Sequence, residues 1–140
     1  MHATPEAQAR TRGFARVLGP FLVIVPIIVI ARLSQDMGAM MAAFFGNPAL
    51  VWIIGAFMLF GGIFIIAQHQ YWSSAAAVIV SLFGWILALR ALALLLFPEH
   101  YEQAGEALLG ALPLVRAIFA VPLLAGLWLT YAGWIAKWKA

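Results

Sequence analysis

The chain has 140 residues, of which 66% are hydrophobic and 9% are charged, and its formal net charge is +3. Soluble domains contain about 45–50% apolar and about 25% charged residues, and a soluble domain of this size could not bury so much apolar surface. The absence of cysteine excludes disulfides, thiol redox chemistry and Cys-ligated metal centres. This composition predicts an integral membrane protein.

Four segments are apolar over about the 20 residues that a helix needs to cross a membrane: residues 14–33, 49–67, 75–97 and 114–136. They predict an all-α fold, a four-helix transmembrane bundle that forms one membrane domain over residues 1–140, with residues 1–13 as a cytoplasmic tail. The first segment has a basic front, as a signal peptide does. Because no small-residue cleavage site follows Ala31, we expect this segment to remain as a span.

The two outer loops, residues 34–45 and 98–112, each predict a short helix that lies in the outer membrane interface. Pro98 suits the first turn of a helix, and Glu99 and Glu102 there would offset the helix dipole. Each loop leads through a glycine and a proline into the next span. The order of span, short helix and span therefore occurs twice, which suggests an internal duplication, although short hydrophobic matches also arise by chance.

Basic residues lie at both ends of the chain: Arg10, Arg12 and Arg16 precede the first span, and Lys137 and Lys139 follow the last. By the positive-inside rule, both termini are expected in the cytoplasm. The acidic residues of the two outer loops agree with this orientation. In a membrane protein a pI near 9.8 indicates orientation, so no nucleic-acid partner is expected.

Small residues recur at helical spacing on one face of the third span: Ala77, Ser81, Gly84, Ala88 and Ala91. Membrane helices associate where small residues let their backbones approach closely. We therefore expect this face to pack within the chain rather than to form a dimer.

Arg90 lies within the third span, eight residues before Pro98 and hence about 12 Å from the outer helix end. An arginine inside a membrane is costly and normally has a partner. Arg32 and Arg116 lie at similar depth, and the three form a candidate contact site. They could pair with loop acids or reach lipid phosphates, or they could bind an anionic headgroup, a quinone oxygen or an acid on a partner helix. The loop acids concerned are Asp36, Glu99, Glu102 and Glu106.

His69 and Trp72 form a second candidate site, in the cytoplasmic turn between the second and third spans. His100 lies at the opposite end of the membrane from His69, so the two cannot share a haem. We expect His69 to be an interface residue rather than a ligand, and we expect no metal or cofactor. The spans contain no acid, and the sequence shows no catalytic serine, histidine and acid set. The protein is therefore expected not to be an enzyme.

The segment between Asn47 and Pro98 contains a series of short motifs. They are Asn47-Pro48-Ala49-Leu50, Gly55, Gly62, His69, Trp72, Gly84-Trp85 and Leu96-Phe97-Pro98. Together they resemble a family of small, four-span bacterial integral membrane proteins of unassigned function. The resemblance covers about a third of the chain. It implies four spans and a location in the bacterial inner membrane, and it implies no substrate, cofactor or catalytic residue.

The sequence leaves three functional hypotheses open. The first is a non-catalytic accessory, scaffold or assembly subunit that packs against a larger membrane complex, for which a respiratory or photosynthetic assembly is a plausible host. The second is a small oligomeric carrier or channel for an anionic or other small solute. The third is an electron carrier that binds haem or quinone. The expected partners are membrane lipids and other membrane proteins or further copies of this chain.

Overall fold

The structure, a computed structural model, describes residues 4–32 and 36–136. Its elements in chain order are α1 (Pro5–Arg32), α2 (Met37–Phe45), α3 (Pro48–Gln68), α4 (Ala75–Leu96), α5 (Pro98–Leu109) and α6 (Leu112–Thr130), and α6 continues as a π-helical turn (Tyr131–Ile135). No strand occurs in these ranges. Helices α1, α3, α4 and α6 are long and apolar enough to cross a membrane. The predicted all-α membrane fold is therefore confirmed.

The first helix begins earlier than the sequence analysis placed it. The Thr4 hydroxyl oxygen accepts a hydrogen bond from the Ala7 backbone N–H at 3.2 Å, and Pro5 occupies the first helical position. Together they start α1 within the residues assigned to a tail. The predicted beginning of the first short helix, at residues 34–35, lies outside the described residues, and so do Lys137 and Lys139.

Side-chain caps and prolines also define the starts of the other long helices. The Asn47 side chain accepts from the Leu50 backbone N–H at 3.2 Å, and Pro48 follows it at the start of α3. Ser74 caps α4 in the same way through the Ala77 N–H, also at 3.2 Å. These caps satisfy backbone donors that the helix itself leaves unpaired.

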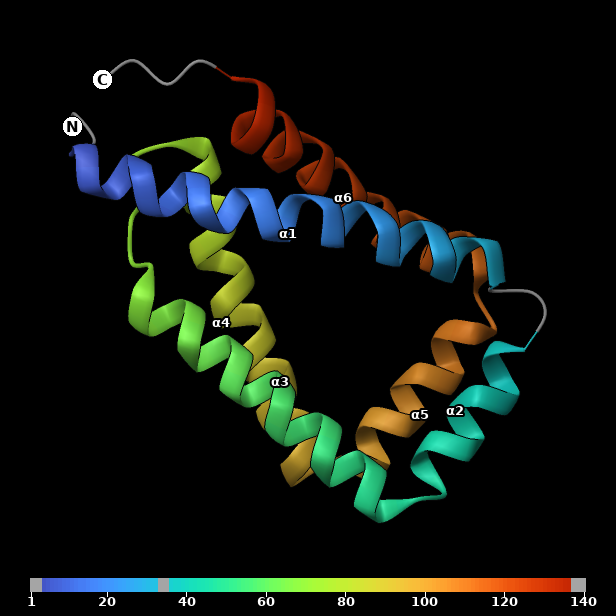
Figure 1. The fold of residues 1–140 in the computed structure, drawn as a ribbon. Coiled ribbons are helices and arrows are strands. Elements are labelled where there is room, and N and C mark those ends of the chain that lie inside the picture. The colour runs from blue at the N-terminus through green and yellow to red at the C-terminus, as the bar shows by residue number, and fades with distance from the viewer. Residues whose placement is uncertain (1–3, 33–35, 137–140) are drawn as a thin grey trace.

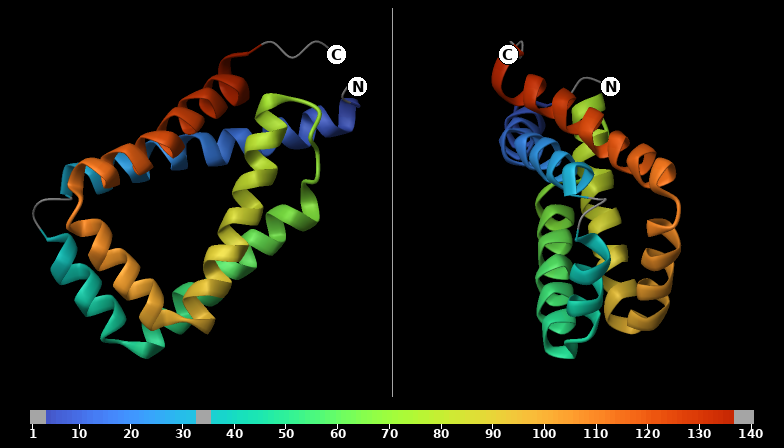
Figure 2. Two further views of the ribbon diagram at one scale, coloured as in Figure 1. Left: turned by 180° about the vertical axis from the view of Figure 1, so that it is seen from behind. Right: turned by 90° about the vertical axis from the view of Figure 1, so that its right-hand side faces the viewer.

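The four long helices form two pairs, α1 with α6 and α3 with α4 (Figure 1). The pairs meet where the N-terminal part of α1 passes the start of α4, and from there they diverge. Helices α2 and α5 lie side by side and connect the far ends of the two pairs, so the outline is triangular in both face views (Figures 1 and 2). Each long helix therefore packs along its length against one neighbour.

The two halves of the chain, α1 to α3 and α4 to α6, contact each other symmetrically. The first helix of each half pairs with the last helix of the other half, giving α1 with α6 and α4 with α3, and the two middle helices, α2 and α5, pair with each other. A Cβ atom on Gly62 of α3 would lie 2.6 Å from the backbone nitrogen of Ala88, and one on Gly126 of α6 would lie 2.7 Å from the backbone carbonyl carbon of Leu22. The two glycines are 64 residues apart, at matching places in the two halves. This agrees with the repeated order of elements in the sequence.

The small-residue face of α4 packs against α3, as predicted. All five of its residues are buried: Ala77, Ser81, Gly84, Ala88 and Ala91. A Cβ on Gly84 would lie 2.7 Å from the Cγ2 atom of Ile65 in α3. Arg90 lies off this face and is exposed.

We expect Gly126→Ala to destabilise the α1–α6 pair. Its added methyl would meet backbone atoms of Leu22 and Val23 at less than 3.0 Å, and such overpacking typically costs about 1–3 kcal/mol. Thermal unfolding in detergent, followed by tryptophan fluorescence, should give a lower Tm. The control is Gly13→Ala in α1, where nothing lies within 4 Å of the added atom. Equal Tm values for the two variants would contradict the close packing described here.

Candidate functional site

The most enclosed polar group lies where the two helix pairs meet. His69 follows the last residue of α3, and its side chain is 0% exposed. Its Nε2 atom lies 2.9 Å from the hydroxyl oxygen of Thr11 in α1, and its Nδ1 atom lies 3.0 Å from that of Ser81 in α4. The imidazole therefore connects three helices that come from both pairs.

The hydrogen bonds around this ring require more protons than a neutral ring provides. The Thr11 hydroxyl also contacts the Ala7 carbonyl at 2.7 Å, and the Ser81 hydroxyl contacts the Tyr71 carbonyl at 3.0 Å. With both ring contacts, four hydrogen bonds need four protons, whereas two hydroxyls and a neutral imidazole supply three. When the ring is neutral, the proton of one hydroxyl must therefore be shared between two acceptors, a ring nitrogen and a backbone carbonyl.

Burial sets the charge of this ring. Removal from water lowers the pKa of His69, and a hydrogen bond with its own backbone opposes this shift more weakly. The surroundings supply aromatic edges from Phe14 and Tyr71, with ring centroids 5.5 and 5.2 Å away. The nearby Arg10 donates to the Gln68 carbonyl at 3.3 Å and pairs with Glu6 at 2.9 Å. Burial therefore favours the neutral form of His69.

Ser81 and His69 form a hydroxyl–imidazole pair of the kind that nucleophilic enzymes use, and the sequence analysis did not find it. Both side chains are 0% exposed, so a substrate could not reach them. In the described part of the chain, no carboxylate hydrogen-bonds to the ring, as a catalytic triad would require. We interpret the pair as a structural junction between helices.

The turn site expected from the sequence divides into two parts. His69 is buried within the chain, whereas Trp72 is 52% exposed. Of the aromatic residues in this turn, it is Tyr71 rather than Trp72 whose ring contacts His69. Thr11 was missed because it was assigned to a tail, and Ser81 was treated as a small packing residue only.

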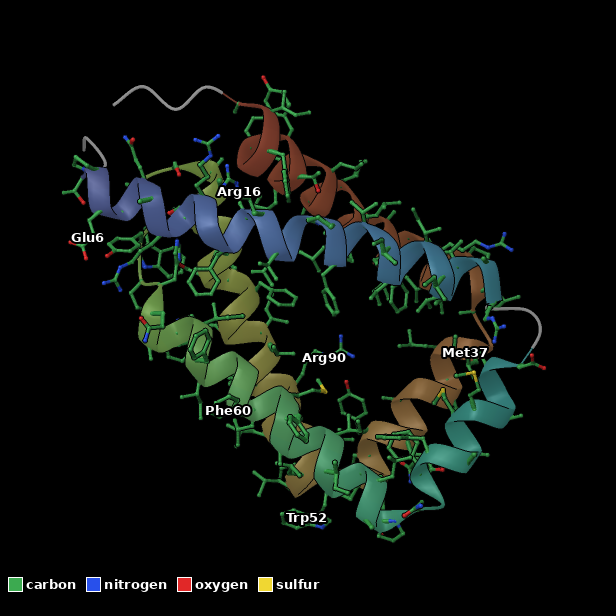
Figure 3. All side chains as sticks on the ribbon, in the orientation of Figure 1. Glu6, Arg16, Met37, Trp52, Phe60 and Arg90 are labelled. Atoms are coloured by element: carbon green, nitrogen blue, oxygen red, sulfur yellow. The ribbon has the colours of Figure 1, made fainter. Side chains whose placement is uncertain are left out.

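Arg90 has a neutral partner within the chain. Its Nε and Nη2 atoms donate to the hydroxyl oxygen of Tyr101 in α5, at 2.9 and 2.6 Å, and its guanidinium lies 5.8 Å from the centre of that ring. Figure 3 shows the Arg90 side chain pointing from α4 into the middle of the triangular outline. Two of the five N–H groups are used, and both lie on one edge of the guanidinium.

The three arginines of the candidate contact site are not brought together by any hydrogen bond or ring contact among the described residues. Arg32 and Arg116 are exposed. The expected ion pairs with loop acids do not form within residues 4–32 and 36–136, where the one ion pair joins Arg10 and Glu6. Arg90 pairs with no loop acid in the described chain because the first turn of α5 places Tyr101, rather than an acid, next to its guanidinium.

Further arginines, which the sequence analysis used only for orientation, hold the end of α6 against α1. Arg12 and Arg16 each donate through Nε to the Gly133 carbonyl oxygen in the π-helical turn, at 3.1 and 3.0 Å. The Trp134 indole N–H donates to the Arg16 carbonyl at 3.2 Å, and the Arg16 guanidinium lies 5.6 Å from the centre of the Trp134 ring. Figure 3 shows Arg16 where α1 faces α6.

An apolar groove of about 520 Å³ lies between α1 and α3, close to the junction of the pairs. Arg10 is the one charged residue of its lining, which otherwise consists of apolar residues such as Phe14 and Val17 of α1 and Gly61 and Phe64 of α3. Such a mostly apolar lining suits hydrocarbon. Among the described residues, no group of three or more His, Asp or Glu side chains comes together to hold a metal ion.

Comparisons with protein-family models, curated proteins and solved structures find no match to this chain. The resemblance based on the segment from Asn47 to Pro98 therefore stays a prediction.

We expect acid to destabilise the fold through His69. Because its pKa is lowered in the folded state, the unfolded chain binds the extra proton first, near the ordinary value of 6.5. The contribution is fully present above that pH and is lost as the pH falls towards the lowered folded-state pKa. The Tm in detergent should therefore decrease from pH 7.5 to pH 5.5.

The His69→Gln variant should have a lower Tm at pH 7.5 and a much smaller dependence on pH over this range. His100→Gln, which removes a histidine on α5 and leaves the junction intact, is the matched control and should keep the wild-type pH dependence. A wild-type Tm that does not change over this range would contradict the assignment of a neutral, buried ring.

Proposed function

We propose that this protein is a non-catalytic integral membrane protein that acts as an accessory, scaffold or assembly subunit of a larger membrane complex. The observation that carries this proposal is the divergence of the two helix pairs. In the most apolar 18-residue windows of the four long helices, only 17–33% of the residues are buried. Large apolar side chains such as Phe57, Phe60 and Val121 are 68–72% exposed. A chain arranged in this way offers wide helix faces for neighbours within the membrane.

The partner that we propose is a transmembrane helix with a carboxylate in its outer half. Arg90 points between the two pairs and has only a neutral partner within the described chain. Because Tyr101 occupies the Nε edge of the guanidinium, the two Nη atoms still offer N–H groups at its end. A carboxylate can accept two parallel hydrogen bonds from that end. A charge about 12 Å inside the membrane gains most from such a partner.

A carrier or channel for anions has less support. Such a path would require Arg32, Arg90 and Arg116 to line one route, whereas no described contact joins them and Arg90 is held by Tyr101 of α5. The buried polar groups Thr11, His69 and Ser81 are packed between helices at one end. They do not continue towards Arg90 through any described hydrogen bond.

The test of the subunit proposal is isolation from native membranes in mild detergent, with identification of the proteins that stay bound. We expect a larger complex in constant ratio with this chain, and we expect Arg90→Leu to reduce its recovery at least about 100-fold, because loss of one partner of a buried pair costs about 3–5 kcal/mol. Arg116→Leu, at the same membrane end, is the control and should keep the complex. Helix content by circular dichroism checks that both variants fold. Isolation of the wild-type chain alone, or unchanged recovery with Arg90→Leu, would contradict the proposal.

We further propose that the protein lies in a bacterial inner membrane with both termini in the cytoplasm. The support is the charge distribution, since Arg10, Arg12 and Arg16 lie at the end where the helix pairs meet and the acids of α5 lie at the other.

Because the chain has no cysteine, single cysteines can test this orientation. In intact spheroplasts, a membrane-impermeant maleimide should label Gln103→Cys in α5, and it should label Ser73→Cys only after permeabilisation. Both native side chains are exposed, so access depends on the side of the membrane. The wild-type chain serves as the unlabelled control, and the reverse labelling pattern would place the termini outside.

A further inference from the structure

The arginines at the junction of α1 and α6 form an arrangement that the subunit proposal does not use. Arg12 and Arg16 approach the same oxygen, the Gly133 carbonyl, through their Nε atoms at 3.1 and 3.0 Å. The contact is close because residue 133 is a glycine, and a Cβ atom there would lie 2.9 Å from the Arg16 backbone nitrogen. The two guanidiniums are therefore held at fixed places rather than free at the surface.

Capping of α6 explains only part of this geometry. Carbonyl groups at a helix C-terminus do attract cations. However, Nε atoms bonded to one oxygen lie within about 6 Å of each other, so the two positive charges repel. In the described part of the chain no carboxylate forms an ion pair with Arg12 or Arg16, and Glu6 is paired with Arg10. A second cation on one carbonyl thus leaves a positive charge that an anion can balance.

The unused edges of the two guanidiniums suit a tetrahedral oxyanion. Both described bonds use Nε, so the Nη atoms of each arginine, with four N–H groups, are left to face another acceptor. Arginine binds phosphate through pairs of parallel hydrogen bonds. Two arginines side by side match a phosphate group with two negative charges, or two phosphates close together.

The position of Arg16 along α1 indicates that the phosphate belongs to a lipid headgroup. Residues 17–31 carry no charge, so Arg16 lies about 24 Å along α1 from Arg32, close to the thickness of a membrane core. Tyr131 and Trp134, 49% and 61% exposed, lie at the same end, as aromatic residues at a membrane boundary do. The two guanidiniums therefore lie at the level of lipid headgroups.

We propose that Arg12 and Arg16 together bind the phosphate of an anionic phospholipid in the leaflet next to the N-terminus of α1. The site favours a headgroup with two negative charges, such as a phosphomonoester or a headgroup with two phosphodiesters, over a zwitterionic one. The bound lipid neutralises the arginine pair and holds α6 against α1. This inference does not depend on the proposed subunit role.

The test is native mass spectrometry of the full chain in neutral detergent, with added cardiolipin, phosphatidylglycerol or phosphatidylcholine. We expect cardiolipin adducts to survive at activation energies that remove phosphatidylcholine. The double variant Arg12→Gln/Arg16→Gln should retain cardiolipin at least about tenfold less than wild type. Arg10→Gln is the matched control, because Arg10 lies on the same turns of α1 but is already paired with Glu6, and it should retain the wild-type level.

Further measurements separate the lipid site from its alternatives. Cardiolipin should raise the Tm of wild type and not that of the double variant, and inorganic phosphate at the same phosphate concentration should not replace it. If inorganic phosphate gives the same shift, the site takes free phosphate and the proposal is wrong. If the double variant only has a lower Tm without lipid and keeps wild-type lipid retention, the arginines act as a helix cap alone.

If the double glutamine variant fails to fold, the same lipid retention is measured on Arg12→Lys/Arg16→Lys. These residues keep the charge but lose the paired N–H geometry, so the preference for cardiolipin over phosphatidylglycerol should decrease while total lipid binding persists. An unchanged preference would contradict recognition by two guanidiniums.

Discussion

Close contact between helix backbones at glycine positions is the constraint on which this structure depends. Lipid chains are as apolar as the side chains they would replace, so helices in a membrane gain little from hydrophobic burial against each other. Gly62 against Ala88 and Gly126 against Leu22 allow each pair to approach closely enough for dispersion contacts along the helices. The two pairs, and through them the places of α2 and α5, follow from these contacts.

Polar groups hold the two pairs to each other. The ring of His69 connects α1 with the ends of α3 and α4, and among residues 4–32 and 36–136 its hydrogen-bond partners are neutral hydroxyls. Hydrogen bonds inside an apolar environment are strong and costly to leave unmade, so this junction is well defined although the pairs diverge from it. At the same end, Arg12 and Arg16 of α1 donate to the Gly133 carbonyl in the π-helical turn. Large apolar side chains along the four long helices stay exposed, and these faces support the proposed role as a subunit of a membrane complex.

Features whose whole signal lies within one helix could be predicted from the sequence. The buried face of α4 was predicted because its small residues recur at helical spacing, and Pro48 and Pro98 marked helix starts within one residue. Contacts between distant segments could not be predicted in this way. Thr11 is 58 residues from His69, and no local pattern joins them. Arg90 was recognised as needing a partner, yet the turn into α5 decided that the partner is Tyr101 rather than an acid.

The sequence by itself determined that the chain is helical, how many helices can span a membrane, and which face of α4 packs, because these properties depend on composition and on a period of 3.6 residues. Only the tertiary structure decided that α1 pairs with α6 and that the pairs diverge. Several spans carry glycine faces, such as those with Gly55, Gly62, Gly126 and Gly133, and any two could have met. The choice among them depends on shape complementarity and on hydrogen bonds between segments far apart in the chain, which a linear pattern does not contain.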